Sequence, residues 1–114
     1  MIVEKQTWGN KNRIHINIIE ENIGSIQIDI FPAEDDIAYL SYLYVQEQFR
    51  GKGYGGKLIT KAESEIKNLG INKIGLWVNR GFSSDFTYEW YQRLGYKSQP
   101  GDDKDNQFMI KCEG

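Results

Sequence analysis

The segment FRGKGYGGKL, residues Phe49 to Leu58, places four glycines within six positions. A glycine loses more conformational freedom on folding than any other residue, at a cost of roughly 0.5–1 kcal/mol relative to alanine inside a regular element. Glycine in return allows positive φ and a close approach of the main chain to a ligand. This concentration of glycine therefore indicates that the backbone itself is needed at this point.

The sequence on either side of this glycine loop predicts a strand before it and a helix after it. Residues 37–45, IAYLSYLYV, are apolar or aromatic on both faces, which is typical of a central strand. After the loop, apolar residues recur at helical spacing (Leu58, Ala62, Ile66, Leu69). Gly70 follows at the position of a C-terminal cap.

A helix that begins near Tyr54 presents unpaired amides and the positive end of its dipole to the loop. These features suit a phosphate, and successive amides in such a turn can form an anion-binding nest. Arg50, Lys52 and Lys57 add positive charge at the same place. A glycine-rich turn with solvated basic residues is the alternative, but the order strand, loop, amphipathic helix favours phosphate binding.

The N-terminal third predicts antiparallel strands. A short strand is expected over residues 2–8, and Ile14, Ile16 and Ile18 then begin a period-2 alternation. The alternation resumes at Ile26 after a turn, so the two runs are typical of a hairpin, and residues 32–36 form the next turn.

The C-terminal part continues with a strand over residues 72–79 and a second helix that Ser84 or Asp85 caps and Gly95 closes. Residues 108–112 are expected to be the last strand. The predicted fold class is α+β, or mixed α/β, with one mostly antiparallel sheet and a βαβ-like crossover. The 114 residues fit a single domain over residues 1–114.

Composition excludes several function classes. The formal net charge of −2 argues against a general nucleic-acid binder. No apolar run approaches the length of roughly 18 residues that a membrane span needs. Cys112 and His15 are the only residues of their types, which leaves neither an internal disulfide nor a cysteine-based or histidine-rich metal site. One thiol and no apparent signal peptide predict a reducing, cytoplasmic setting.

Two phosphate-binding motifs compete for the glycine loop. Gly51, Gly53 and Gly56 spell the G-x-G-x-x-G dinucleotide fingerprint, but that fingerprint needs an acidic residue at the end of the next strand. The next strand ends at Val78-Asn79-Arg80 without a carboxylate, and a Walker loop fails for want of Gly-Lys-Ser/Thr. Nicotinamide binding is therefore disfavoured.

Arg50-Gly51-Lys52-Gly53-Tyr54-Gly55 resembles the Q/R-x-x-G-x-G/A motif of the GNAT superfamily of acyl-CoA-dependent N-acetyltransferases. The resemblance extends over residues 40–70 as that family's central strand, pyrophosphate loop and helix. IGLWVN resembles the next strand, and WYQRLGY, Trp90 to Tyr96, resembles the late helix with its tyrosine. Residues 14–112 can be laid onto a GNAT-like fold.

The resemblance implies acetyl-CoA as co-substrate. It implies that the loop amides from Arg50 to Gly55 hold the pyrophosphate and that the pantetheine arm pairs with the strand at Leu43, Tyr44 and Val45. Gly56 belongs to the same loop. Asn79 is a further expected contact, although the segment from Asn79 to Tyr91 is longer than the family's usual spacing. The residues expected to bind the cofactor are Leu43, Tyr44, Val45, Arg50, Gly51, Lys52, Gly53, Tyr54, Gly55, Gly56 and Asn79.

The resemblance also implies direct attack of an amine on the thioester, without an acyl-enzyme, so Cys112 need not be a nucleophile. Tyr91 occupies the family's tyrosine position and is expected to protonate the leaving thiolate; a core aromatic contact is its alternative role. A backbone amide near Leu43 to Val45 is expected to stabilise the oxyanion.

The general base is left open. Counting along the strand puts Tyr39 on the same face as Ser41, Leu43 and Val45, near where some family members carry a glutamate, so Tyr39 is a catalytic candidate. An un-ionised tyrosine is a poor base, and Glu34, Asp35, Asp36, a water chain or His15 are alternatives.

The sequence departs from the family at its N-terminus and before the late helix. The usual helix pair between the first two strands is missing or vestigial, so the acceptor site is expected to be open or to be completed by a second subunit in a homodimer. The segment RGFSSDF, with Phe82 and Phe86, is expected to be an insertion that shapes the acceptor pocket. The acceptor is then an unknown amine-bearing small molecule or protein. A CoA-binding or sensing domain without turnover, and a plain protein-interaction domain, are the alternatives.

Overall fold

The computed structural model describes residues 1–9, 12–79, 85–100 and 106–112. Within them lie seven strands and two α-helices, in the order that the sequence predicts. One of the strands, only two residues long, and a 3₁₀ turn are not predicted by the sequence. The elements are β1 (Ile2–Trp8), β2 (Arg13–Glu20), β3 (Gly24–Ile30), β4 (Ile37–Val45), a 3₁₀ turn (Glu47–Phe49), α1 (Tyr54–Asn68), β5 (Lys73–Asn79), α2 (Asp85–Arg93), β6 (Lys97–Ser98) and β7 (Asn106–Cys112).

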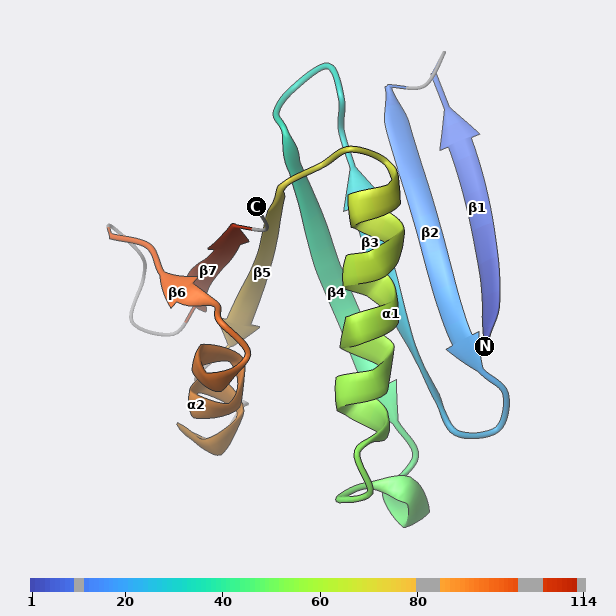
Figure 1. Ribbon diagram of the computed structural model, residues 1–114, viewed down its shortest axis with the longest axis vertical. Coiled ribbons are helices and arrows are strands. Elements are labelled where there is room, and N and C mark those ends of the chain that lie inside the picture. The colour runs from blue at the N-terminus through green and yellow to red at the C-terminus, as the bar shows by residue number, and fades with distance from the viewer. Residues whose placement is uncertain (10–11, 80–84, 101–105, 113–114) are drawn as a thin grey trace.

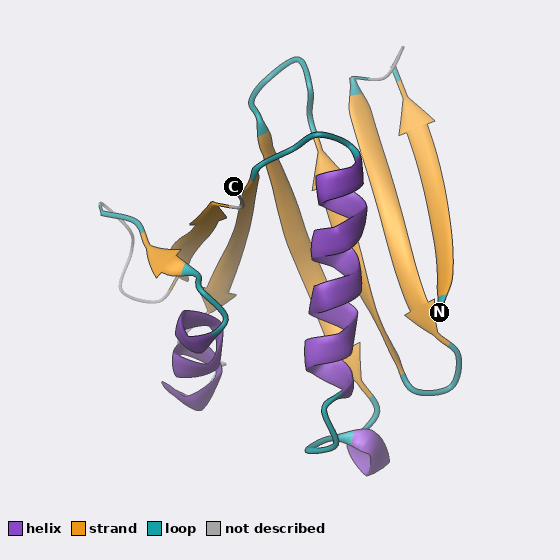
Figure 2. Cartoon of the chain, in the orientation of Figure 1, coloured by secondary structure: helices purple, strands orange, loops and turns teal. Residues whose placement is uncertain are grey.

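One sheet holds the strands in the order β1-β2-β3-β4-β5-β7-β6, with β4 at its centre. All neighbours pair antiparallel except β4 and β5, which are parallel and joined through α1. This arrangement confirms the predicted mixed α+β sheet with one crossover. Both helices lie against the same face of the sheet, and no described helix covers the other face (Figures 1 and 2). Neither described helix is both long and apolar enough to cross a bilayer.

The core fills the space between α1 and the sheet. Along β2 and β3, buried residues alternate with half-exposed ones, so one face of each strand packs inward. From α1, the fully buried side chains are those at the helical spacing seen in the sequence (Leu58, Ile59, Ala62, Ile66). Burial of these apolar side chains, at about 25 cal/mol per Å², fixes α1 and the loop before it against β3 and β4.

Two glycines end the helices as predicted. Gly70 and Gly95 have positive φ values of 79° and 102°, a region that L side chains avoid. After α1, the amide of Ile71 donates to the carbonyl of Ile66, and after α2 the amide of Tyr96 donates to the carbonyl of Tyr91. These bonds satisfy carbonyls that helix ends otherwise leave unpaired.

A β-bulge in β4 determines the shape of the cleft. Gln27 of β3 pairs with Ser41 and Ser25 with Tyr44, so one residue of β3 faces two of β4. Tyr42 takes up the extra residue with a φ of 52°. The parallel pairing of β4 with β5 stops at Leu40 and Leu76, and beyond that point the two strands separate.

The bulge overturns the predicted alternation along β4. Ala38 and Leu40 are buried toward α1, and beyond the bulge Leu43 and Val45 also pack against the core. The prediction that Tyr39 shares a face with Leu43 and Val45 is therefore wrong, because the extra residue at Tyr42 reverses the alternation. Tyr39 and Ser41 lie on the face of the sheet that no described helix covers.

At the N-terminal end of the sheet, residues 9–12 alone separate β1 from β2, and Trp8 pairs with Arg13. The connection has no room for a helix pair, in agreement with the predicted absence. Of the RGFSSDF segment, residues 80–84 and the Phe86 side chain lie outside the described residues, as does the candidate cap Ser84.

Candidate functional site

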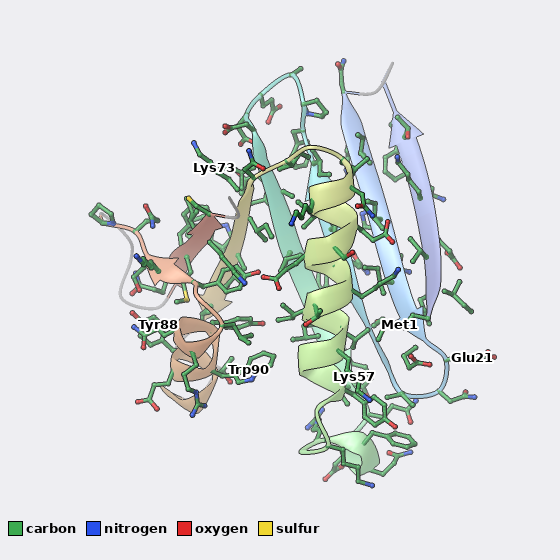
Figure 3. All side chains as sticks on the ribbon, viewed as in Figure 1. Met1, Glu21, Lys57, Lys73, Tyr88 and Trp90 are labelled. Carbon is green, nitrogen blue, oxygen red and sulfur yellow. The ribbon has the colours of Figure 1, made fainter. Side chains whose placement is uncertain are left out.

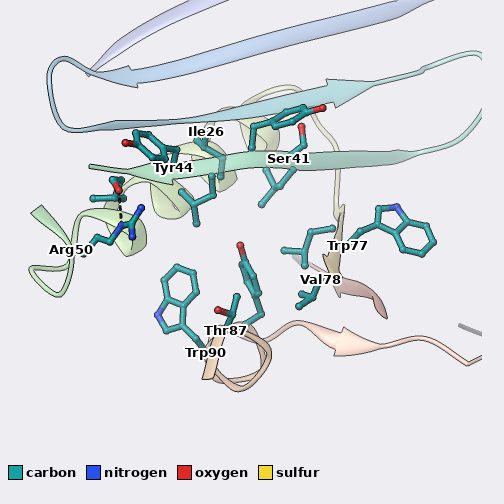
Figure 4. Close-up of a pocket in the computed structure, with 14 residues that line it drawn as sticks. Ile26, Ser41, Tyr44, Arg50, Trp77, Val78, Thr87 and Trp90 are labelled. Atoms are coloured by element: carbon teal, nitrogen blue, oxygen red, sulfur yellow. Dashed lines mark hydrogen bonds between the residues drawn. The ribbon is translucent and has the colours of Figure 1, made fainter. Parts of the chain in front are cut away.

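A cavity of about 490 Å³ opens where β4 and β5 separate. Its walls come from β4, β5 and α2, with Arg50 at one end, as Figure 4 shows. The lining residues are Ile26, Leu40, Ser41, Tyr42, Leu43, Tyr44, Val45, Arg50, Leu76, Trp77, Val78, Thr87, Trp90 and Tyr91. Because β5 pairs with β4 only as far as Leu40, the backbone of residues 42–45 presents an unpaired strand edge to this cavity. Such an edge can pair with an extended ligand as with another strand.

The glycine loop leads from this strand edge into α1. Gly51 and Gly53 have positive φ values of 76° and 86°, so both positions favour glycine on conformational grounds. The six amides from Gly51 to Gly56 donate to no backbone carbonyl or side chain in the described chain. An added Cβ on Gly56 would meet no atom within 4 Å. Consecutive free amides at a helix N-terminus form a site for an anion.

Three cations surround these amides, and each lies above an aromatic ring. The Cζ of Arg50 is 5.9 Å from the centre of the Tyr44 ring, and its Nε donates to the carbonyl of Val45 at 2.9 Å. The Nζ of Lys52 lies 5.8 Å from the ring of Phe49, and that of Lys57 lies 5.2 Å from the ring of Tyr54. None of the three forms an ion pair with a described carboxylate.

Tyr91 lies on the α2 side of the cavity. Burial raises its pKa to about 12, and no described residue hydrogen-bonds its hydroxyl. Its ring contacts those of Trp90 and Tyr96, with centres 5.1 and 5.9 Å apart. A tyrosine of this kind stays protonated at neutral pH, so its hydroxyl can donate a hydrogen bond to an anion in the cavity.

Tyr39 lies away from the cavity. Its hydroxyl donates to Oδ2 of Asp35 at 2.6 Å, and its ring contacts Phe31 and Phe108. Burial, followed by the bond to Asp35 and the negative charge of the turn, raises its pKa to about 12. The catalytic assignment of Tyr39 stays a prediction, and neither its position nor its pKa supports it.

The other candidates for a base are also absent from the described residues that line the cavity. Nδ1 of His15 lies 2.8 Å from Oδ1 of Asp29, which Arg13 also contacts on the sheet face opposite α1. Asp36 forms an ion pair with Lys73 at 3.5 Å. Cys112 is exposed at the end of β7, opposite Lys73, and does not line the cavity. Asn79 ends β5, and its side chain lies outside the described residues.

The cavity contains residues that sequence reasoning did not select. Thr87 lies one helical turn before Tyr91, and helical spacing alone would have placed it on the same face. Trp90 also lines the cavity and points from α2 toward the first turn of α1 (Figure 3). Ser41 and Trp77 have no comparable signal, because their places depend on the bulge and on the separation of the strands.

Comparison with known proteins identifies the family. Residues 10–98 match the family model described as Acetyltransferase (GNAT) domain. An uncharacterized N-acetyltransferase of Methanocaldococcus jannaschii is 34% identical over 64 residues, which are 56% of this chain and 27% of that protein. One of Chlorobaculum tepidum is 37% identical over 62 residues, which are 54% of this chain and 35% of that protein. The matched region therefore spans about a third or less of these curated relatives.

The fold agrees with solved structures. The PaiA N-acetyltransferase of Thermoplasma acidophilum, solved in complex with coenzyme A, superposes with a TM-score of 0.71 at 25% identity, over 90% of this chain and 62% of that one. The family match covers well over half of the sequence and includes the glycine loop and α1. The chain is a member of the GNAT acetyltransferase family.

Proposed function

We propose that this chain binds acetyl-CoA in the cleft between β4 and β5 and transfers the acetyl group to a primary amine by direct attack. The observation that carries the proposal is the row of free amides from Gly51 to Gly56 beside three cations without carboxylate partners among the described residues. An anionic pyrophosphate satisfies both, because it accepts hydrogen bonds and supplies negative charge.

The rest of the co-substrate has a place along β4. An extended pantetheine arm, which carries amide groups, pairs with the free edge of residues 42–45 and directs the thioester toward the bulge. The edge is fixed by the core packing of Leu43 and Val45, so its free amides are held in position before a ligand arrives. An amide so fixed can stabilise the oxyanion that forms on the carbonyl.

The reaction balances without a covalent enzyme intermediate. The neutral amine nitrogen attacks the carbonyl carbon, the new N–C bond forms, and the C–S bond then breaks. An ammonium acceptor loses one proton to water before attack and a second after it. The leaving thiolate takes a proton from Tyr91, which regains it from the proton released by nitrogen.

One observation favours a second candidate, a domain that binds CoA without turnover. No Asp, Glu or His lies among the described lining residues, so the cavity offers no side-chain base of ordinary kind. The two candidates share the binding step and differ in catalysis alone.

A thermal-shift titration with acetyl-CoA, CoA and NAD tests the binding step. A ligand at 100 times its Kd stabilises the fold by roughly 2.7 kcal/mol. We expect both CoA species to raise the Tm and NAD to leave it unchanged. Release of free thiol from acetyl-CoA in the presence of amines then separates the enzyme from the binding domain. No shift with either CoA species would contradict both candidates.

A further inference from the structure

A row of polar side chains crosses the sheet face opposite α1 and ends at the cavity. Asn17 of β2 pairs with Gln27 of β3, and Gln27 pairs with Ser41 of β4, so the three lie side by side on consecutive strands. At the outer end, Glu4 of β1 pairs with Asn17. The buried residues that alternate with this row on β2, β3 and β4 face α1, so the row itself faces away from the helix.

Two oxygen atoms of this row lack a hydrogen-bond partner. Oδ1 of Asn17 and Oγ of Ser41 are buried, and no described residue donates to either. Buried polar groups are nearly always paired in folded proteins, and an unpaired one costs stability. The adjacent row differs, since Asp29 accepts from Arg13 and the Tyr39 hydroxyl donates to Asp35.

Ser41 connects the row to the cavity in which the proposed reaction takes place. Ser41 lines the cavity at the bulge, on the opposite side from Thr87 and Trp90 of α2 (Figure 4). A serine hydroxyl changes direction by rotation about one side-chain bond, so its oxygen can turn toward a ligand in the cavity. The cavity is lined from both faces of the sheet, since Leu43 packs on the helix side while Ser41 lies on the other.

We propose that this row, Ser41, Gln27 and Asn17 with Glu4 beyond, is the acceptor subsite, and that the acceptor is an extended amine with a second cationic hydrogen-bond donor. The inference rests on the proposed transferase function. Neighbouring strands lie roughly 4.8 Å apart, so Ser41 and Asn17 are separated by about 10 Å across the sheet. The reacting nitrogen lies near Ser41, and the second donor bonds to Asn17 Oδ1 once rotation of the half-exposed Asn17 side chain turns that buried oxygen outward.

Charge and hydrogen-bonding capacity both favour an ammonium at the far end. An ammonium only donates hydrogen bonds, and the unpaired Asn17 Oδ1 only accepts them. The row carries one formal charge, the carboxylate of Glu4, and no cation. A diamine whose nitrogens are separated by two strand spacings pairs with both Ser41 and Asn17, whereas a monoamine of equal length leaves Asn17 unpaired.

The test compares linear diamines of increasing length with monoamines of the same length, in the wild type and in Asn17→Ala and Ser41→Ala. For the diamine that spans two strand spacings, we expect KM to be about tenfold or more below that of the monoamine, because a hydrogen bond from a charged group is worth at least that factor. Asn17→Ala removes this preference by raising KM for the diamine to that for the monoamine, while Ser41→Ala raises KM for both.

Ser25→Ala is the matched control, since Ser25 lies on the same face of β3 two residues before Gln27. Both test variants remove an unpaired buried group, so they are expected to fold at least as stably as the wild type. Equal KM for diamine and monoamine, with transfer to both, would overturn the inference and leave the proposed function intact. Absence of any transfer would contradict the enzyme itself.

If no transfer to any amine is detected, a binding measurement still tests the acceptor subsite. Titration of the isotope-labelled protein with the diamine is expected to shift the NMR signals of the Asn17 side-chain amide and the Ser41 backbone amide, and to leave those at the C-terminal end of α1 in place. No shift at Asn17 in the presence of CoA would overturn the subsite.

Discussion

Gly55, in the first turn of α1, lies against the indole of Trp90 on α2: a Cβ on Gly55 would come 3.4 Å from Cη2 of that ring. This contact joins the glycine loop to the helix that carries Tyr91, the next residue after Trp90. The two parts of the proposed site are therefore in direct contact. A substitution that tests the loop alone must be made at a glycine whose added methyl group does not touch α2.

Gly56→Ala is such a substitution. The added methyl meets no atom within 4 Å. Alanine is favoured over glycine in a helix by roughly 0.8–1 kcal/mol, so we expect the free energy of unfolding to stay the same or to rise by about that amount. The Kd for CoA should rise about tenfold or more, because the methyl occupies the space in front of the free amides. Denaturant unfolding and calorimetric titration measure the two effects.

Gly70→Ala is the control for this loop substitution. Its positive φ of 79° strains an alanine. Stability should therefore fall by roughly 1–2 kcal/mol, the cost of a left-handed conformation for an L residue, while CoA affinity stays unchanged. Wild-type CoA affinity in Gly56→Ala would contradict the assignment of the loop.

Tyr91→Phe tests the proposed role of Tyr91 as general acid. The side chain lines the cavity and its hydroxyl has no described partner, so its removal costs little packing. We expect kcat to fall about 100-fold or more, as is usual for loss of a general acid, with the Kd for CoA unchanged. Tyr88→Phe, on the same helix with its hydroxyl bonded to Ser98, is expected to retain wild-type kcat. An equal loss in both variants would indicate damage to α2 instead.

The raised pKa values of Tyr39 and Tyr91 predict the course of alkaline titration. Both rise from 10.0 to about 12, so the folded state favours the neutral phenols. Their contribution to stability is therefore complete below pH 10 and is lost as the pH rises from 10 to about 12. In a spectroscopic titration of tyrosinate, Tyr39→Phe and Tyr91→Phe should each remove one late-ionising group. Loss of an early-ionising group instead would contradict the burial of that side chain.

Lys57 is expected to act on CoA rather than on folding. It lies in the first turn of α1, where the helix dipole disfavours a cation. Lys57→Gln should therefore leave stability unchanged or slightly raised, while the Kd for CoA increases and depends less on salt. Lys61→Gln is the matched control, because Lys61 lies one turn further along and pairs with Glu65 at 3.1 Å. A Kd for CoA that rises equally in both variants would indicate that the loss of overall positive charge, and not a contact made by Lys57, weakens binding.

The sequence was sufficient for the parts of the molecule that local patterns determine. Period-2 alternation located β2 and β3, helical spacing located α1, and the glycines at 70 and 95 marked the helix ends. The glycine loop and the WYQRLGY segment identified the family. The faces of Tyr39 and Ser41 could not be predicted relative to the rest of β4, because one extra residue at Tyr42 reverses the alternation. No local pattern marks that bulge, which depends on the pairing of Ser25 and Gln27 from a different strand.

The separation of β4 from β5 beyond Leu40 has a consequence for the protein when the cleft is empty. Residues 42–45 form a sheet edge in the interior of the sheet, and unpaired edges invite association with other chains. A neighbouring protein strand would have to fit between β4, β5 and α2, whereas a single thin, extended molecule fits without disturbing them. The interior position thus leaves less space beside the unpaired backbone edge for a strand of another chain than a surface edge would. A surface strand with the same free amides would lack this protection.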